Sequence, residues 1–270
     1  MNSIRIPPAS SILAVIAVIF LLSAGRPAAA QDADQDTDQE TASDQKPAQN
    51  QKPKKWTLQY DLGYRQTSGN ETSHDLRTEL KVTLKRPKDD LRLTSSYARG
   101  EADGEVSADR RDFLAKYNRL FIKKAYWSAF LFYERDRVRD IKRRRQIGPA
   151  IGARFYDTEE LFFSSDVGAV WDETTSDESG DTDSELKGLW NVDFSYVPLP
   201  DLKFEEKIRW VQDLKTRNFE ISSETSAYVP LYKKLFLKIG LTDNYVNEPQ
   251  KDRKKNDLTI LTSLSYVTHF

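Results

Sequence analysis

The sequence predicts an all-β protein: a transmembrane, antiparallel, up-and-down β-barrel of about twelve strands with both termini in the periplasm. Three observations carry this prediction. Apolar and polar side chains alternate with a period of two from Trp56 to Phe270, an export signal precedes this region, and short connections alternate with longer ones. A closed barrel hydrogen-bonds every backbone group, so its apolar outer face needs no covering helix.

The first segment, residues 56–65, shows the alternation most clearly. Successive residues of a strand point to opposite faces, so the pattern describes a sheet with one apolar and one polar face. No amphipathic helical stretch is present to cover the apolar face, which favours lipid as its surroundings. The apolar core of a soluble barrel is the alternative. The two faces carry Trp56, Leu58, Tyr60, Leu62 and Tyr64 against Thr57, Gln59, Asp61, Gly63 and Arg65.

Residues 1–30 have the features of a cleaved signal peptide. Arg5 supplies a positive charge, residues 12–22 form an apolar run, and the alanines at 28–30 form a small-residue cleavage site. The run is shorter than the about 20 residues of a membrane-spanning helix, although an uncleaved anchor is the alternative. The chain has no cysteine for lipid attachment. We expect export to the cell outer membrane of a Gram-negative bacterium.

Residues 31–55 form a separate acidic, glutamine-rich segment without aromatic side chains. Such a segment buries too little apolar surface to offset its ordering entropy, so we expect a disordered periplasmic tail. Its alternating aspartates lack the glycine turn and the terminal glutamate of a calcium-binding loop. The barrel is therefore expected at residues 56–270.

The overall composition is more typical of a soluble domain than of a membrane protein. Charged residues make up 31% of the chain, and the mean hydropathy is −0.67. A barrel, however, needs apolar residues only at alternate positions over about 10 residues per strand. The 41 basic and 42 acidic residues nearly cancel, which argues against a nucleic-acid partner. At about 18 residues per strand and connection, residues 56–270 accommodate about twelve strands.

In the first half, turn residues mark where the strands end. Gly69 and Asn70 allow a tight turn after the first strand, and Pro87 ends the second because proline cannot donate to the ladder. At residues 126–133 both alternate sets of positions carry apolar side chains, so the sequence leaves open which of them faces outward on the fifth strand. The outward residues expected on strands two, three, four and six are Leu76, Leu80, Val82 and Leu84; Leu91, Leu93 and Tyr97; Phe113, Ala115, Tyr117 and Phe121; and Ile147, Ile151 and Phe155.

The second half repeats this layout. An acidic stretch at 173–184 follows the seventh strand, Pro198 and Pro200 end the eighth, and polar residues 247–256 precede the last. The outward residues expected on strands seven to twelve are Leu161, Phe163, Val167, Ala169 and Trp171; Leu186, Trp190, Val192, Phe194 and Tyr196; Leu202, Phe204, Ile208 and Trp210; Phe219, Ile221 and Val229; Leu235, Leu237, Ile239 and Leu241; and Leu258, Ile260, Leu264, Tyr266 and Phe270.

The connections also follow a rhythm. Those near Lys88, Lys123, Asp157, Pro200 and Lys233 are short, whereas longer, charged ones are expected at residues 100–104, 135–143, 173–184 and 247–256. Outer-membrane barrels have short periplasmic turns and longer external loops, which is why both termini are expected in the periplasm. Aromatic residues gather near the expected strand ends, where rings with a polar handle favour the lipid–water interface.

Several short stretches together resemble one protein family. They are Thr67-Ser68-Gly69-Asn70, residues 97–104, Tyr133-Glu134-Arg135-Asp136, and residues 148–152 followed by Tyr156-Asp157-Thr158-Glu159. In this order and spacing they resemble the salt-induced outer membrane proteins (YdiY-like), classed under a domain of unknown function, over about residues 60–270. The resemblance implies an outer-membrane β-barrel and supplies no catalytic residues. The acidic tail and the acidic loop near Asp181 do not match it.

The end of the chain resembles the signal read by the barrel-assembly machinery. Phe270 is terminal, and apolar or aromatic residues precede it at alternate positions. Tyr266 and Phe270 are therefore the candidate assembly signal. The expected partners are this machinery, outer-membrane lipid and lipopolysaccharide, while the oligomeric state stays open.

We expect no enzyme, no metal site and no cofactor. The absence of cysteine excludes thiolate chemistry, and His74 and His269 are expected at opposite ends of the barrel, too far apart to share a metal. His74 with Ser73 and Asn70 suggests a site like that of an outer-membrane phospholipase. Ser73 and His74 are adjacent on a strand, however, and point to opposite faces. A lipid hydrolase is therefore a third alternative.

Charged residues at inward positions predict a polar lumen. Opposite charges on neighbouring strands would form ladders across the wall, and about twelve strands limit the width of any pore. We expect a structural or stress-related role, with a narrow, weakly selective channel for small solutes or ions as the alternative. Lys203, Lys207 and Arg209 form a cationic patch suited to solute contact. The lumen candidates are Arg77, Glu79, Lys81, Lys203, Glu205, Lys207 and Arg209.

Overall fold

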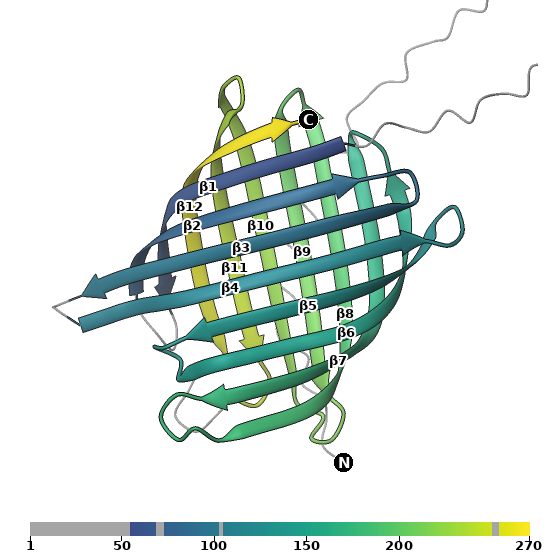
Figure 1. The fold of residues 1–270 in the computed structure, drawn as a ribbon. Coiled ribbons are helices and arrows are strands. Elements are labelled where there is room, and N and C mark those ends of the chain that lie inside the picture. Colours follow the sequence, from purple (N-terminus) through teal and green to yellow (C-terminus); the bar gives the residue numbers. More distant parts are fainter. Residues whose placement is uncertain (1–54, 69–72, 103–104, 250–253) are drawn as a thin grey trace, which may run out of the picture. The chain divides into compact units, whose positions relative to one another are not determined.

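The computed structural model describes residues 55–68, 73–102, 105–249 and 254–270, which form a closed β-barrel (Figure 1). These residues contain twelve strands, each antiparallel to its neighbours, and β12 pairs with β1 to close the barrel. The predicted barrel and its strand number are confirmed. The strands are β1 Lys55–Ser68, β2 Ser73–Lys85, β3 Asp89–Ala102, β4 Glu105–Leu120, β5 Ala125–Asp136, β6 Ile141–Asp157, β7 Leu161–Ser176, β8 Thr182–Leu199, β9 Leu202–Asp213, β10 Phe219–Tyr232, β11 Leu235–Val246 and β12 Asn256–His269.

The N-terminal predictions fall almost entirely outside these residues. The expected signal peptide at 1–30 and tail at 31–54 lie outside the described part of the chain. Lys55, assigned to the tail from the sequence, is instead the first residue of β1, where it pairs in register with Lys85. Within the described residues there is no helix long and apolar enough to cross a membrane.

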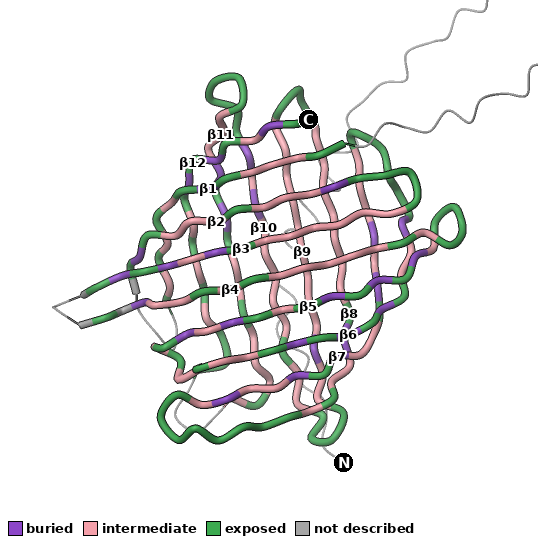
Figure 2. Tube along the Cα trace, in the orientation of Figure 1, coloured by how far each residue is buried: buried purple, intermediate pink, exposed green. Residues whose placement is uncertain are grey.

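The burial of side chains is reversed relative to a soluble protein, as the alternation along each strand in Figure 2 indicates. Leu62 and Leu264, paired in register, are each about half exposed, at 48% and 49%. Asp61, the neighbour of Leu62, is only 2% exposed. Soluble proteins usually bury leucine and leave aspartate exposed. The outer face is therefore the apolar one, which argues against the alternative of a soluble barrel.

The structure resolves the facing of β5, which the sequence left open. Tyr126, Ser128 and Phe130 are buried inside the barrel, whereas Trp127 and Leu131 are exposed on its outer face. Periodicity could not decide between the two faces because both carry large apolar rings. What decides is the pairing with β6, whose small inward residues leave room for those rings.

Three of the four longer loops expected from the sequence are shorter than predicted. Strands continue through most of residues 100–104, 135–143 and 173–184, so the flanking hairpins extend further. Ion pairs accompany these extensions: Arg99 lies 3.1 Å from Glu101, and Arg143 lies 3.6 Å from Glu173. Charged residues are compatible with a strand beyond the membrane because both of its faces are then in water. Of the expected loop at 247–256, residues 247–249, 254 and 255 lie between β11 and β12, Asn256 is already the first residue of β12, and residues 250–253 lie outside the described part of the chain.

The turn between β5 and β6 is bonded to the turn between β7 and β8. The Asp140 carboxylate accepts a hydrogen bond from the Ser176 hydroxyl, 2.6 Å away. It also accepts bonds from the backbone N–H groups of Asp177 and Glu178, at 2.9 and 2.8 Å. These bonds, the Ser176 bond first, lower the pKa of Asp140 because they favour its ionised form. Two neighbouring turns are thus held together at the end of the barrel where β5 and β7 finish.

Candidate functional site: a charged lumen

The seven lumen candidates come from two strands, β2 and β9, and all lie at inward positions. On β2, they alternate with the outward residues Leu76, Leu80 and Val82; on β9 they alternate with outward residues that include Phe204 and Ile208. A strand with this period places every second side chain in the lumen. The candidates on β2 are Arg77, Glu79 and Lys81, and those on β9 are Lys203, Glu205, Lys207 and Arg209.

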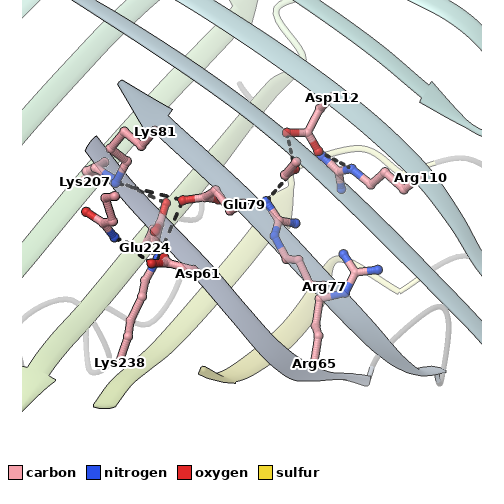
Figure 3. Close-up of polar contacts among 12 residues, drawn as sticks. Asp61, Arg65, Arg77, Glu79, Lys81, Arg110, Asp112, Lys207, Glu224 and Lys238 are labelled. Carbon is pink, nitrogen blue, oxygen red and sulfur yellow. Dashed lines mark hydrogen bonds and ion pairs between the residues drawn. The ribbon is translucent and has the colours of Figure 1, made fainter. Parts of the chain in front are cut away.

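Glu79 is the centre of the contacts on the β2 side (Figure 3). One of its carboxylate oxygens lies 3.2 Å from Arg77, and the other lies 3.9 Å from Lys81 and 3.7 Å from Lys238. Lys238 lies on β11, and the strands β12 and β1 separate β11 from β2 in the wall. Glu79 therefore joins strands that are not neighbours in the wall.

Asp61 and Lys238 form a fully buried ion pair beside Glu79. Their charged atoms are 3.0 Å apart, and Lys238 is 1% exposed. Burying two charges is costly unless further hydrogen bonds satisfy them. Asp61 accepts such bonds from the amide of Gln59 at 3.0 Å and from the hydroxyl of Ser265 at 2.6 Å. These hydrogen bonds offset part of the cost of burying the two charges.

A second chain of contacts runs from Arg77 along the inner wall toward β5 (Figure 3). Arg77 donates to the Ser96 hydroxyl at 2.9 Å, and Ser96 donates to Asp112 at 2.5 Å. Arg110 then lies 3.3 Å from Asp112 and 3.1 Å from Glu134. Four neighbouring strands, β2 to β5, are linked in this way.

The cationic patch predicted on β9 is interleaved with acceptors. Lys203 lies 2.6 Å from Glu205 on its own strand, and Lys207 lies 3.7 Å from Glu224 on β10. Arg209 donates to the amide oxygen of Gln146 at 2.7 Å and lies over the ring of Phe130 at 5.8 Å. The three cations do share a face, as predicted, but each already has a partner. Their contact with a solute stays a prediction.

Other ion pairs cross the lumen from one wall to the other. The ammonium of Lys116 on β4 lies 2.8 Å from Asp166 on β7 and 3.8 Å from Asp193 on β8. Arg92 on β3 also lies 3.8 Å from Asp193. The sequence predicts that these side chains are inward, but it does not predict which of them meet.

An apolar cluster also lies inside the barrel and was missed from the sequence. It consists of Phe130, Val170, Leu189 and Val211, from β5, β7, β8 and β9. Val170, Leu189 and Val211 have inward parity on their strands, which is the signal that could have found them, whereas Phe130 lies on β5, whose facing the sequence leaves open. Because apolar residues are expected on the outer face of such a barrel, the alternation did not predict an apolar cluster inside it. Part of the lumen is therefore filled by apolar side chains packed together.

Tyr126 is a further buried residue that the sequence did not single out. Its hydroxyl donates to Asp166 at 3.0 Å, and the Arg154 guanidinium lies 5.8 Å from the centre of its ring. Gly152 makes room for this ring, because a Cβ there would lie 2.7 Å from the Tyr126 Cζ atom. The aromatic ring thus covers the glycine and joins the charged network.

The two histidines lie on the two strands that flank β1, His74 on β2 and His269 on β12, and they are opposite the two ends of β1. His74 is opposite Gln66 in the register and stacks on Tyr64, with ring centres 5.9 Å apart. His269 is opposite Thr57, whose hydroxyl lies 3.0 Å from its ring nitrogen. A shared site for these two is excluded by this separation. In the part of the chain that the structure describes, no group of three or more potential ligands is arranged to hold a metal.

The candidate assembly residues lie on the seam between β12 and β1. Tyr266 is opposite Tyr60 in the register. Phe270 and Trp56 exchange two backbone hydrogen bonds, at 2.9 and 3.1 Å, while the side chain of Phe270 is among the most exposed, at 76%. The backbone of Phe270 therefore helps to close the barrel, and its ring is free of close packing.

This architecture can be compared with known proteins. Residues 60–267 match the family DUF481, described as a protein of unknown function. The chain belongs to the DUF481 family. The match covers nearly the whole barrel and agrees with the resemblance to a family of unknown function. No curated protein matches the sequence.

Solved structures of porins and of an outer membrane channel superpose on this chain to different extents. The NanC porin superposes with a TM-score of 0.54 at 12% identity, covering 77% of this chain and 98% of the porin. An outer membrane channel, COG4313 from Pseudomonas putida F1, has a TM-score of 0.49 at 9% identity, covering 83% and 100%. The KdgM porin in complex with disordered oligogalacturonate has 0.42 at 12% identity, covering 76% and 98%. At such identities the likeness to NanC shows a shared fold.

Proposed function

We propose that this DUF481 member is an outer-membrane β-barrel with both termini in the periplasm and a structural, stress-related role. The apolar outer face, the expected signal peptide and the fold shared with the NanC porin support the location. The stress-related part rests on the resemblance to salt-induced outer membrane proteins. In this proposal the partners are outer-membrane lipid, lipopolysaccharide and the barrel-assembly machinery, and the protein catalyses no reaction.

The observation that carries a structural role is the set of ion pairs crossing the lumen. Arg92 on β3 and Asp193 on β8 approach to 3.8 Å, although four strands separate β3 from β8 along the wall. Lys116 adds contacts of 2.8 and 3.8 Å to the same opposite wall. Charged groups in contact across the lumen stand in the path of a solute. We infer that the barrel at rest does not pass solutes freely.

Conductance in planar lipid bilayers tests this proposal. Refolded wild-type protein should produce no steady current steps, whereas a variant carrying Arg92→Ser and Lys116→Ser should conduct more than wild type, because the ion pairs that these two residues make with Asp166 and Asp193 are gone. Lys203→Ser is the matched control, since the Lys203 ion pair lies along one strand rather than across the lumen. Wild-type steps as large as those of the double variant would contradict a lumen closed by these pairs.

A narrow, weakly selective channel is the second candidate. The fold shared with the NanC porin favours it, and so does the mixture of cations and carboxylates in the lumen. Because charges of both signs line the path, neither cations nor anions should be strongly preferred. Wild-type current steps with a reversal potential near zero in a salt gradient would favour this channel over the structural role.

The placement of the termini has its own test. A protease-sensitive tag inserted after Gln31 should survive protease treatment of intact cells and be cut once the outer membrane is permeabilised. Cleavage in intact cells would mean that the N-terminus lies outside.

A further inference from the structure

The outer face of the barrel carries a belt of arginines at the end where β3 and β5 finish and β4 and β6 begin. Arg111 has the outward parity of Phe113 on β4, and Arg135 has that of Leu131 and Tyr133 on β5. Arg143 and Arg145 continue the belt on β6. These arginines lie at one edge of the apolar outer face.

Arg111 and Arg135 face each other directly. They are partners in the β4–β5 register, which places two like charges side by side, and such pairs are destabilising. Among the described residues neither arginine forms an ion pair with a carboxylate, and the Nε of Arg135 is buried without a hydrogen-bond partner. An unpaired, partly buried donor on a guanidinium is costly. The arrangement therefore suits an anion.

Other arginines at this end of the barrel do have carboxylate partners. Arg143 and Arg145 share Glu173, at 3.6 and 3.9 Å, and Arg137 lies 3.5 Å from Asp109. The lack of a carboxylate partner at Arg111 and Arg135 is thus not general to the arginines at this end of the barrel.

A shallow groove lies beside Arg111 on the outer face. Its volume is about 470 Å³, and Tyr97, Phe113 and Tyr133 contribute its rings. The Arg111 guanidinium lies 5.3 Å from the centre of the Tyr97 ring. Phe113 lies two residues after Arg111 on β4, and Tyr133 lies two residues before Arg135 on β5, so the groove runs from the arginines toward the middle of the apolar face. A ligand for this surface needs a strong anion attached to an apolar chain.

We propose that Arg111 and Arg135, with the adjoining aromatic groove, bind a phosphate group and an acyl chain of a phosphorylated glycolipid of the outer leaflet. Guanidinium groups bind phosphate through paired, charge-assisted hydrogen bonds, so two facing arginines suit a dianionic phosphate. Basic pockets at the membrane surface recognise phosphorylated lipid headgroups on this basis. The choice of the outer leaflet rests on the proposed function, which places the turns after β3 and β5 outside the cell.

Binding is tested with the refolded full-length barrel in a nonionic detergent. Bis-phosphorylated lipid A is titrated and the complex is measured by native mass spectrometry, with dephosphorylated lipid A and phosphatidylglycerol as parallel ligands. The double variant Arg111→Ala, Arg135→Ala should lose about tenfold or more in affinity for lipid A, the equivalent of at least one charge-assisted hydrogen bond. Dephosphorylated lipid A should bind wild type and variant equally weakly.

Arg119→Ala is the matched control. Arg119 lies on β4 with the same outward parity as Arg111 but close to the opposite end of that strand. Its loss should leave lipid A affinity unchanged. Heat-modifiable migration on gels verifies that each variant is folded, and Arg111→Gln with Arg135→Gln replaces the alanine pair if the latter does not fold.

Two results would overturn the proposal: unchanged lipid A affinity in the folded double variant, or an equal loss of phosphatidylglycerol binding, which would indicate a general anionic-lipid surface. The detergent experiment does not depend on orientation. Failure of the proposed function would instead appear in the tag-cleavage experiment, so the two failures are distinguishable.

Discussion

The inner and outer faces of the barrel wall alternate along the same strands but are held in different ways. On the inner face of β2, Glu79 is bound by directional contacts to cations from β2 and β11. On the outer face of the same strand, Leu80 is 42% exposed, and its apolar side chain makes only non-directional contacts. The inner face therefore depends on the identity of partners, whereas the outer face depends only on being apolar.

Glu206 is an exception to this division between a polar inner face and an apolar outer face. It has the outward parity of Phe204 and Ile208 on β9, yet it is a carboxylate. It accepts hydrogen bonds from the hydroxyls of Ser223 and Thr225 on β10, at 2.7 and 2.5 Å. A polar group can therefore occupy the outer face when the adjacent strand supplies its donors locally.

Removal of Lys238 should produce the largest loss on the inner face. Lys238→Met leaves Asp61 buried without its cation, and breaking one partner of a buried pair costs about 3–5 kcal/mol. Urea unfolding of the refolded barrel measures this free energy. Lys203→Met is the control, because Lys203 is 42% exposed and should change stability by about 0–1 kcal/mol. Equal losses in the two variants would mean that burial of the pair does not matter.

Adjacent residues of β2 test the division between faces directly. Leu80→Arg places a charge on the lipid side, which should lower the free energy of unfolding by about 2–4 kcal/mol. Lys81→Leu should cost much less, because Glu79 keeps Arg77 and Lys238 as partners. Unfolding in lipid vesicles measures both variants. Similar losses would refute the assigned faces.

Removing the two donors to Glu206 should cause a smaller loss of stability, and replacing Glu206 itself should restore it. Ser223→Ala with Thr225→Val removes both donors and leaves a carboxylate unpaired against lipid, which should cost about 2 kcal/mol of unfolding free energy. Adding Glu206→Leu should restore most of this loss, since no polar group then remains. If the triple variant is no more stable than the double, the hydroxyls stabilise the sheet independently of Glu206.

Deletion of Phe270 should have the smallest effect on stability and act mainly on assembly. Its ring is 76% exposed, so its removal should cost at most about 2 kcal/mol once the barrel is folded. We expect lower membrane insertion in cells but near-normal refolding in detergent, measured by heat-modifiable gel migration in both settings. Normal insertion of the truncated protein would remove Phe270 from the assembly signal.

The sequence by itself determined the barrel, its strand number and the facing of most side chains. Period-two alternation acts within each strand, so Leu80 and Lys81 can be assigned to opposite faces without knowing their neighbours. The same rule also places Lys238 on the inner face of its strand. It failed for β5, where both faces are apolar, and it misjudged loop lengths because paired charges let strands extend beyond the membrane.

Only the tertiary structure decided which inward residues meet. Contacts such as Lys116 with Asp193, or Glu79 with Lys238, join strands that are not neighbours in the wall. They depend on the stagger of each strand pair and on the closure of the whole sheet, which place residues from distant strands at one height. The pairing of Arg111 with Arg135 follows from the β4–β5 register in the same way. No local pattern carries this information, because a shift of register would change the partners while leaving the alternation within each strand intact.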